Sequence, residues 1–240
     1  VLTGTGTVHG RRVALIACEF SFLAGSIGVA AAERIVTAIE RATAERLPLL
    51  ASPTSGGTRM QEGTLAFVQM VKIAAAVAEH KASHLGYFVY LRNPTTGGVF
   101  ASWGSLGHVT VAEPGALVGF LGPRVYQALY NEPFPEGVQT AENLYRKGVI
   151  DGVVPLRGVR QLVHRLLRVL VEPDHPDTST SRAVTTVDDV PDIPAWQSVM
   201  LSRRSERPGI RQLLRHAASA PVRLSGTGEG ESDSTVLVSL

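Results

Sequence analysis

Cysteine is nearly absent from this 240-residue chain, in which Cys18 stands alone. A single cysteine excludes an internal disulfide and a cysteine-rich zinc site. No apolar run reaches the roughly 18 residues that a membrane-spanning helix needs, and the first residues show no signal-peptide pattern. These absences predict a cytoplasmic protein with no membrane segment and no bound metal.

Lysine is also scarce, because 20 of the 23 basic residues are arginines. The arginines are scattered along the sequence, whereas a nucleic-acid-binding surface would gather them on one stripe. Their excess over acidic residues falls within residues 1–170, which suits an anionic small ligand better than a nucleic acid. Hydrophobic residues at 44%, charged residues at 18% and 24 glycines are typical of an α/β enzyme core.

Apolar strands alternate with amphipathic helices up to residue 171, which predicts a layered α/β fold with crossover connections. The expected helices cover residues 30–46, 65–79 and 158–171. The expected strands cover residues 12–19, 47–52, 86–91, 108–112, 116–120 and 149–154.

The composition changes after residue 171. Residues 172–194 begin with a polar stretch punctuated by prolines, which is typical of a linker. Two short helical patterns and an apolar, strand-like stretch at 235–240 follow. We expect residues 1–171 to form one domain and residues 195–240 to begin a second, with the strand at 235–240 unpaired within one copy.

Two glycine pairs, Gly56-Gly57 and Gly97-Gly98, each lie between a predicted strand and a predicted helix. Glycines at such turns let other groups approach the backbone closely. The free N–H groups at a turn and helix start carry a positive partial charge, which can stabilise a developing oxyanion. Either pair alone is better interpreted as an ordinary tight loop, and neither matches the P-loop pattern of phosphate-binding proteins.

The order of the motifs is more specific than any one of them. The motifs are EFSFLAGSIG at 19–28, SGGTRMQE at 55–62, PTTGGV at 94–99, AEPGALVGFLGPRV at 112–125 and RKGVIDGVV at 146–154. With these motifs the chain resembles the β subunit of the bacterial carboxyltransferase component of acetyl-CoA carboxylase over residues 2–170, and residues 196–208 resemble the start of the partner α subunit. The four-cysteine zinc ribbon of that family has no counterpart among these residues.

The resemblance implies a crotonase-like (ClpP/crotonase) ββα superhelix and a carboxyltransferase activity. In that family the carboxyl group moves from carboxybiotin on a carrier protein to acetyl-CoA, or a close acyl-CoA, to give malonyl-CoA. Gly97 and Gly98 would form a backbone oxyanion hole supported by Gly56 and Gly57, and an α-type domain would supply a second hole. The implied partners are acyl-CoA, a biotin carboxyl carrier protein, biotin carboxylase, an α-type carboxyltransferase domain and further copies of this chain. The residues expected to contact substrate are Thr58, Arg59, Thr96 and Arg124.

Several alternatives stay open at this point. A biotin-dependent decarboxylase subunit, or a CoA-binding assembly module without catalysis, would share these motifs. A hydratase is disfavoured because residues 99–107 contain no acid, so Glu113 is better interpreted as a loop or cap residue. Arg59 and Arg124 are equally compatible with structural ion pairs, and Cys18 with a small core residue. The seven histidines lack metal-ligand spacing.

Overall fold

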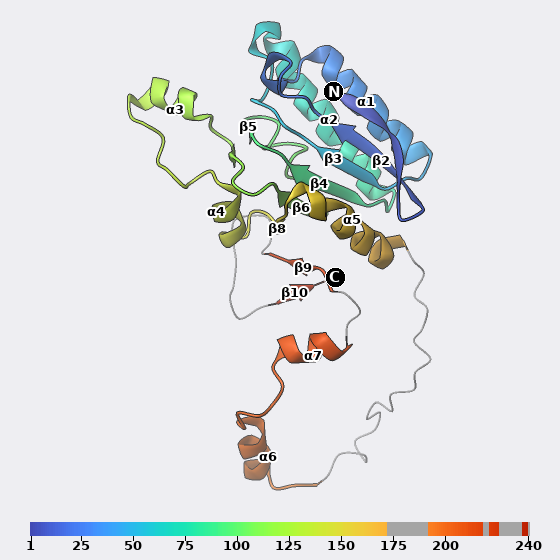
Figure 1. Ribbon diagram of the computed structural model, residues 1–240, viewed down its shortest axis with the longest axis vertical. Coiled ribbons are helices and arrows are strands. Elements are labelled where there is room, and N and C mark those ends of the chain that lie inside the picture. The colour runs from blue at the N-terminus through green and yellow to red at the C-terminus, as the bar shows by residue number, and fades with distance from the viewer. Residues whose placement is uncertain (172–191, 218–220, 226–236, 240) are drawn as a thin grey trace. The chain divides into compact units, whose positions relative to one another are not determined.

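The computed structural model describes residues 1–171, 192–217, 221–225 and 237–239 (Figure 1). The chain divides into two compact units. One unit comprises Val1–Leu170 together with Val222–Leu240, and the other comprises Val171–Pro221. Most of the predicted linker at 172–194 lies outside the described residues.

A six-stranded sheet forms the centre of the larger unit, in the order β1-β2-β3-β4-β6-β8. The first pair is antiparallel, and every later pair is parallel. Parallel neighbours require crossover connections, so the predicted α/β alternation is confirmed. The strands are β1 (Leu2–Val8), β2 (Arg11–Ala17), β3 (Leu49–Ser52), β4 (Tyr87–Leu91), β6 (Val109–Ala112) and β8 (Gly152–Val153).

Helices cover both faces of this sheet (Figure 1). Helices α1 (Val29–Ala44) and α2 (Thr64–Ala82) pack on one face, and α5 (Leu156–Val171) packs on the other. Strand β4 divides its side chains between the two layers, because successive residues of a strand point to opposite faces. Tyr87, Val89 and Leu91 join the α1–α2 cluster, whereas Phe88 and Tyr90 join the α5 cluster.

Strand β1 was not predicted from the sequence. Its residues alternate glycine and threonine, and six of the seven are exposed, so no hydrophobic pattern marks the strand. Pairing with β2 over the full length from Leu2 to Val8 holds it in the sheet. The sequence also missed two short helices, α3 (Pro123–Tyr130) and α4 (Ala141–Arg146).

The predicted strand at 116–120 is confirmed only in part, because it does not join the main sheet. Its centre forms β7 (Val118–Gly119), which pairs in parallel with β5 (Thr95–Thr96) in a separate two-stranded sheet. This small sheet places the loop after β4 beside the segment that follows β6.

The C-terminal end differs from the expectation of an unpaired strand. Strand β10 (Val238–Ser239) pairs antiparallel with β9 (Arg223–Leu224), and Val222 is buried in the cluster that contains α5. The Ser225 N–H donates to Asp151 Oδ1 at 3.2 Å, which ties this segment to the larger unit. Residues 235, 236 and 240 of the predicted strand lie outside the described residues. Burial raises the pKa of Asp151 above its usual value.

The smaller unit contains α6 (Ala195–Ser202) and α7 (Ile210–Ala217). Both match the short helical patterns expected after the linker. Among the residues described in the two units, no helix is long and apolar enough to cross a membrane.

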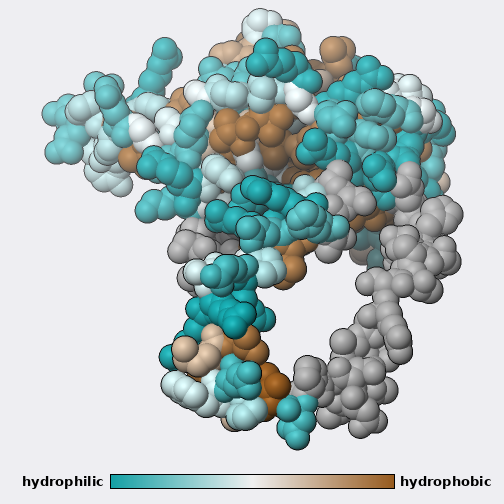
Figure 2. Space-filling model, turned by 60° about the horizontal axis from the view of Figure 1, so that its bottom comes forward, coloured by the Kyte–Doolittle hydropathy of each residue, from teal (hydrophilic) through white to brown (hydrophobic). Residues whose placement is uncertain are grey.

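Part of the apolar surface of the larger unit remains uncovered. Figure 2 shows a mainly hydrophilic face with a hydrophobic area near the centre of the view. On helix α2, the first turns expose large apolar side chains that a packed single domain would normally cover. They are Leu65, Phe67, Val68 and Val71, which are between 53% and 69% exposed.

His80, on helix α2, is a completely buried polar residue. Its Nδ1 lies 2.9 Å from Thr43 Oγ1, and its Nε2 lies 3.4 Å from the Gly86 carbonyl oxygen. Desolvation lowers the pKa of His80 below its usual value, because the charged ring is disfavoured in this environment. The folded protein therefore contains the neutral ring at neutral pH.

We expect the free energy of unfolding to decrease as the pH falls from about 7.5 to about 5.5. The unfolded chain takes up a proton on His80 through this range, whereas the folded chain resists protonation. Chemical denaturation of His80→Gln should show a shallower dependence on pH than the wild type. His216→Gln changes an exposed histidine and should keep the wild-type slope. Equal slopes for all three proteins would contradict this assignment.

Candidate active site

The two glycine pairs predicted as a site lie against each other. Gly56-Gly57 follows β3 and Gly97-Gly98 follows β4 and β5, so both turns leave the same edge of a parallel sheet. A Cβ atom added to Gly57 would lie 3.6 Å from Gly97 Cα, and one added to Gly97 would lie 3.4 Å from Gly57 Cα. Both residues have positive φ, +114° and +65°, which L side chains rarely adopt. Glycine is thus required here by backbone conformation, whereas a Cβ at either position would make only ordinary van der Waals contact with the opposite turn.

Backbone hydrogen bonds join three loops into one platform beneath these turns. The Ser55 N–H donates to the Pro94 carbonyl at 2.7 Å, and the Thr96 N–H returns a bond to the Ser55 carbonyl at 2.9 Å. The Gly97 N–H donates to the Gly119 carbonyl at 3.0 Å. The motif at 112–125 was noticed in the sequence, but this contact of Gly119 with the second turn was not expected.

The loop that follows Gly119 is held by a side chain from further along the chain. Gln139 accepts a hydrogen bond from the Leu121 N–H and donates one to the Leu121 carbonyl. A Cβ on Gly119 would overlap the Gln139 side chain. Gln139 is buried, and no sequence pattern marked it, because its partner is a backbone loop 18 residues away.

Several N–H groups at the meeting point of the two turns have no acceptor. Within the part of the chain that the structure describes, the N–H groups of Thr58, Gly98 and Val99 make no hydrogen bond. Thr58 lies against Gly98, because a Cβ added to Gly98 would come 2.9 Å from Thr58 Oγ1. Free backbone donors at such a turn provide a site for an anionic oxygen.

The four predicted substrate-binding residues take different positions. Thr58 is half-buried beside Gly98, as described above. Thr96 is buried, and its hydroxyl donates to the Ser55 carbonyl at 3.4 Å. Arg124 is exposed near the start of α3, and among the described residues no hydrogen bond or ion pair joins it to either glycine turn. Contact of these residues with substrate stays a prediction.

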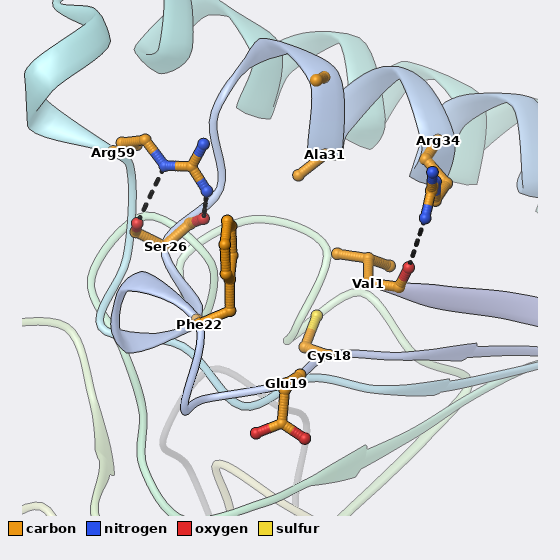
Figure 3. Close-up of a pocket in the computed structure, with 10 residues that line it drawn as sticks. Val1, Cys18, Glu19, Phe22, Ser26, Ala31, Arg34 and Arg59 are labelled. Atoms are coloured by element: carbon orange, nitrogen blue, oxygen red, sulfur yellow. Dashed lines mark hydrogen bonds between the residues drawn. The ribbon is translucent and has the colours of Figure 1, made fainter.

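Arg59 holds the loop that precedes α1. Its guanidinium donates to the Ser26 hydroxyl and the Ser26 carbonyl, at 3.2 and 2.8 Å (Figure 3). It also pairs with Glu62 at 3.0 Å. It also lies 5.9 Å from the centre of the Phe22 ring. The structural ion pair considered from the sequence is therefore present.

Glu62 extends this cluster to the start of α1. Its Oε2 accepts a hydrogen bond of 2.6 Å from the Val29 N–H, the first residue of the helix. That bond, followed by the bond from Arg59, lowers the pKa of Glu62 below its usual value. A Cβ on Gly28 would overlap the Glu62 carboxylate, so a glycine precedes the helix here.

A pocket of about 270 Å³ opens beside this cluster. Arg34 and Arg59 stand on opposite sides of the group drawn in Figure 3, with the Phe22 ring between them. Cys18 also lines the pocket, and burial raises the pKa of its thiol, which disfavours the reactive thiolate. The pocket therefore offers cationic and aromatic groups rather than a nucleophile.

Glu113 has a structural partner. Its Oε2 accepts a hydrogen bond from the Asn93 N–H at 3.1 Å, and the Asn93 side chain accepts one from the Leu117 N–H at 2.9 Å. This arrangement fits the loop role expected from the sequence. Across the described ranges, no group of three or more His, Cys, Asp or Glu residues is placed to hold a metal ion.

Replacing Glu62 should loosen the loop before α1. We expect Glu62→Ala to speed amide exchange at residues 26–30, because the Val29 N–H loses its acceptor and Arg59 loses its ion pair. Hydrogen–deuterium exchange measures this directly. Gln61→Ala, at the exposed neighbouring position, is the matched control and should exchange like the wild type. Unchanged exchange in Glu62→Ala would contradict the proposed role of Glu62 in holding the loop before α1.

Comparison with known sequences gives a consistent family. The carboxyl transferase domain family matches residues 1–236. A protein described as a probable biotin-dependent acyl-coenzyme A carboxylase beta3 subunit, from Mycobacterium tuberculosis strain H37Rv, is 67% identical over 237 residues, which is 99% of this chain and 47% of that protein. The acetyl-coenzyme A carboxylase carboxyl transferase subunit beta of Opitutus terrae is 44% identical over 180 residues, covering 75% of this chain and 62% of that subunit.

Solved structures share the fold. The transcarboxylase 12S structure, determined with methylmalonyl-coenzyme A and methylmalonic acid bound, has a TM-score of 0.62 and 26% identity over 69% of this chain and 32% of that one. A Pseudomonas malonate decarboxylase hetero-tetramer has a TM-score of 0.64 and 21% identity over 89% of this chain and 78% of that one. This similarity confirms the predicted crotonase-like α/β fold. The chain spans about half the length of the mycobacterial relative.

Proposed function

The chain belongs to the carboxyl transferase domain family, and from that membership we propose that it forms the acyl-CoA-binding half of a biotin-dependent acyl-CoA carboxylase. Its reaction would move the carboxyl group from carboxybiotin to acetyl-CoA or a close acyl-CoA, with malonyl-CoA as the product from acetyl-CoA. The observation that carries this proposal is the contact of two glycine turns with free N–H groups at Thr58, Gly98 and Val99.

These N–H groups suit the charge that the reaction develops. Removal of a proton from the α-carbon of the acyl group places negative charge on the thioester oxygen as an enolate. Each well-placed backbone donor would lower the barrier by about 2.7–4 kcal/mol. The C–N bond of carboxybiotin would break to release CO2, and its electron pair would stay on the ureido nitrogen, which would take the α-proton. The enolate carbon would then attack the released CO2 to form the new C–C bond. No side chain of this half has to act as the base.

The remaining parts of the larger unit suit the rest of the substrate. The Arg34–Phe22–Arg59 pocket and exposed Arg124 offer cationic groups for the phosphates of CoA. Arg59 already holds Ser26 and Glu62, so its main role would be to shape the pocket wall. Arg124 has no ion pair among the described residues, which leaves it open to a phosphate.

The uncovered apolar surface of α2 suits a second domain. We assign it to an α-type carboxyltransferase domain, which would supply the oxyanion hole for the biotin ureido oxygen. Biotin carboxylase and a biotin carboxyl carrier protein would complete the enzyme, and a homo-oligomer would provide the paired domains. The names of the relatives support a carboxylase with subunits, and these specific partners are our proposal.

Gly98→Val tests the proposed oxyanion hole in the complete enzyme. The added side chain would meet Thr58 at the free donors, so we expect loss of more than nine-tenths of the transcarboxylation rate with a much smaller change in CoA affinity. Malonyl-CoA formation and CoA titration measure the two quantities. Gly4→Val is the control, because a Cβ there has no atom within 4 Å. A folded Gly98→Val enzyme that keeps most of its rate would overturn the proposal.

CoA binding by this half should depend on salt. We expect weak binding whose affinity decreases as the ionic strength rises, because the phosphates are the charged anchor. Calorimetric titration at low and high salt measures it, and Arg124→Gln should weaken binding mainly at low salt. Arg46→Gln, an exposed arginine at the far end of α1, should bind like the wild type. Binding that ignores salt would contradict the phosphate contact.

A further inference from the structure

Both carbonyl groups of the second glycine turn, Gly97 and Gly98, accept hydrogen bonds from residues four positions further along the chain. The Gly97 carbonyl accepts a bond of 3.1 Å from the Ala101 N–H, although residues 97–105 form turns and not the helix expected after Gly98. The next carbonyl, that of Gly98, is held differently, because it accepts its bond from the Ser102 hydroxyl at 2.5 Å. A single side chain therefore controls the peptide group between Gly98 and Val99.

That peptide group carries one of the free donors. In a trans peptide the C=O and N–H point in opposite directions, so a bond that fixes the Gly98 carbonyl also aims the Val99 N–H. Glycine restrains its own backbone least of all residues, and this peptide follows two glycines in a row. Without an anchor, the peptide could rotate and present its carbonyl oxygen where an anionic oxygen would bind.

The anchor is itself held in place. The Ser102 carbonyl accepts bonds from both the N–H and the hydroxyl of Ser105, each 3.2 Å long. The next residue, Trp103, is fully buried, and its carbonyl accepts a bond of 2.7 Å from the fully buried Tyr87 hydroxyl. Since Tyr87 belongs to β4, this chain of bonds connects Ser102 to the central sheet.

We propose that Ser102 is a positioning residue for the backbone oxyanion hole, which it keeps oriented by donating its hydroxyl proton to the Gly98 carbonyl. This inference rests on the proposed function, because the oriented donor serves the acyl-CoA enolate. Ser102 touches neither substrate nor reacting atoms in this account. It fixes the direction of the Val99 N–H, and the sheet fixes Ser102 through Trp103 and Tyr87.

The test compares Ser102→Ala with Ser102→Thr in the complete enzyme. Alanine removes the donor, whereas threonine keeps a hydroxyl on the same carbon. We expect kcat for transcarboxylation to fall about tenfold or more in Ser102→Ala, with KM for acyl-CoA within about twofold of the wild type. Ser102→Thr should recover most of the rate. Ser83→Ala is the control, because it removes the same kind of hydroxyl-to-carbonyl bond at the far end of α2.

A second measurement is independent of activity. Hydrogen–deuterium exchange without substrate should be faster at residues 97–104 in Ser102→Ala and close to the wild type in Ser102→Thr and Ser83→Ala. Unchanged exchange in Ser102→Ala overturns the proposal that the Ser102 hydroxyl restrains the Gly98–Val99 peptide group, whatever the activity. A wild-type enzyme without transcarboxylation overturns the proposed function instead. Faster exchange with an unchanged kcat overturns the positioning role, because the turn would then be loosened without consequence.

Discussion

The site depends on one contact, the close approach of two backbone turns at Gly57 and Gly97. Positions for Cβ atoms on each lie only 3.4–3.6 Å from the Cα of the other, and both residues have positive φ. A side chain on either would strain its own backbone, because L residues rarely adopt these positive φ values. This approach is possible because β3 and β4 are parallel neighbours whose following loops leave the sheet at the same edge.

Each turn is then fixed by groups that are distant in sequence. The loop from Ala24 supports the first turn, since its carbonyl accepts a bond of 2.8 Å from the Gly56 N–H. The Gly119 carbonyl accepts a hydrogen bond from the Gly97 N–H of the second turn. The Gln139 side chain holds the loop after Gly119 through the backbone of Leu121. The candidate site therefore consists of backbone groups that are positioned mainly by hydrogen bonds to other backbone groups. Side chains contribute by hydrogen-bonding to the backbone of the surrounding loops. Such preorganisation suits a site that stabilises charge without a catalytic side chain.

These side chains hold different peptide groups. Arg59 and Glu62 fix the loop before α1, whereas Ser102 fixes the carbonyl of Gly98. Both arrangements restrain glycine-rich backbone, whose freedom would otherwise have to be lost when a ligand binds. Helix α2, which follows the first glycine turn in the chain, leaves an apolar surface exposed.

The sequence by itself determined the local features of this protein. Alternating apolar patterns predicted the helices near α1, α2 and α5 and the parallel strands, because burial of one face leaves a periodic trace. The glycine pairs and their flanking motifs predicted a candidate site at two turns, which the structure places in contact with each other. Strand β1 left no such trace, because its residues are exposed and its stability comes from pairing with β2. Only the tertiary structure brought Gly57 to Gly97, Gly119 beneath the second turn and Ser102 to the Gly98 carbonyl. In each of these contacts at least one partner is a backbone group, and a backbone group carries no residue type that a sequence pattern could reveal.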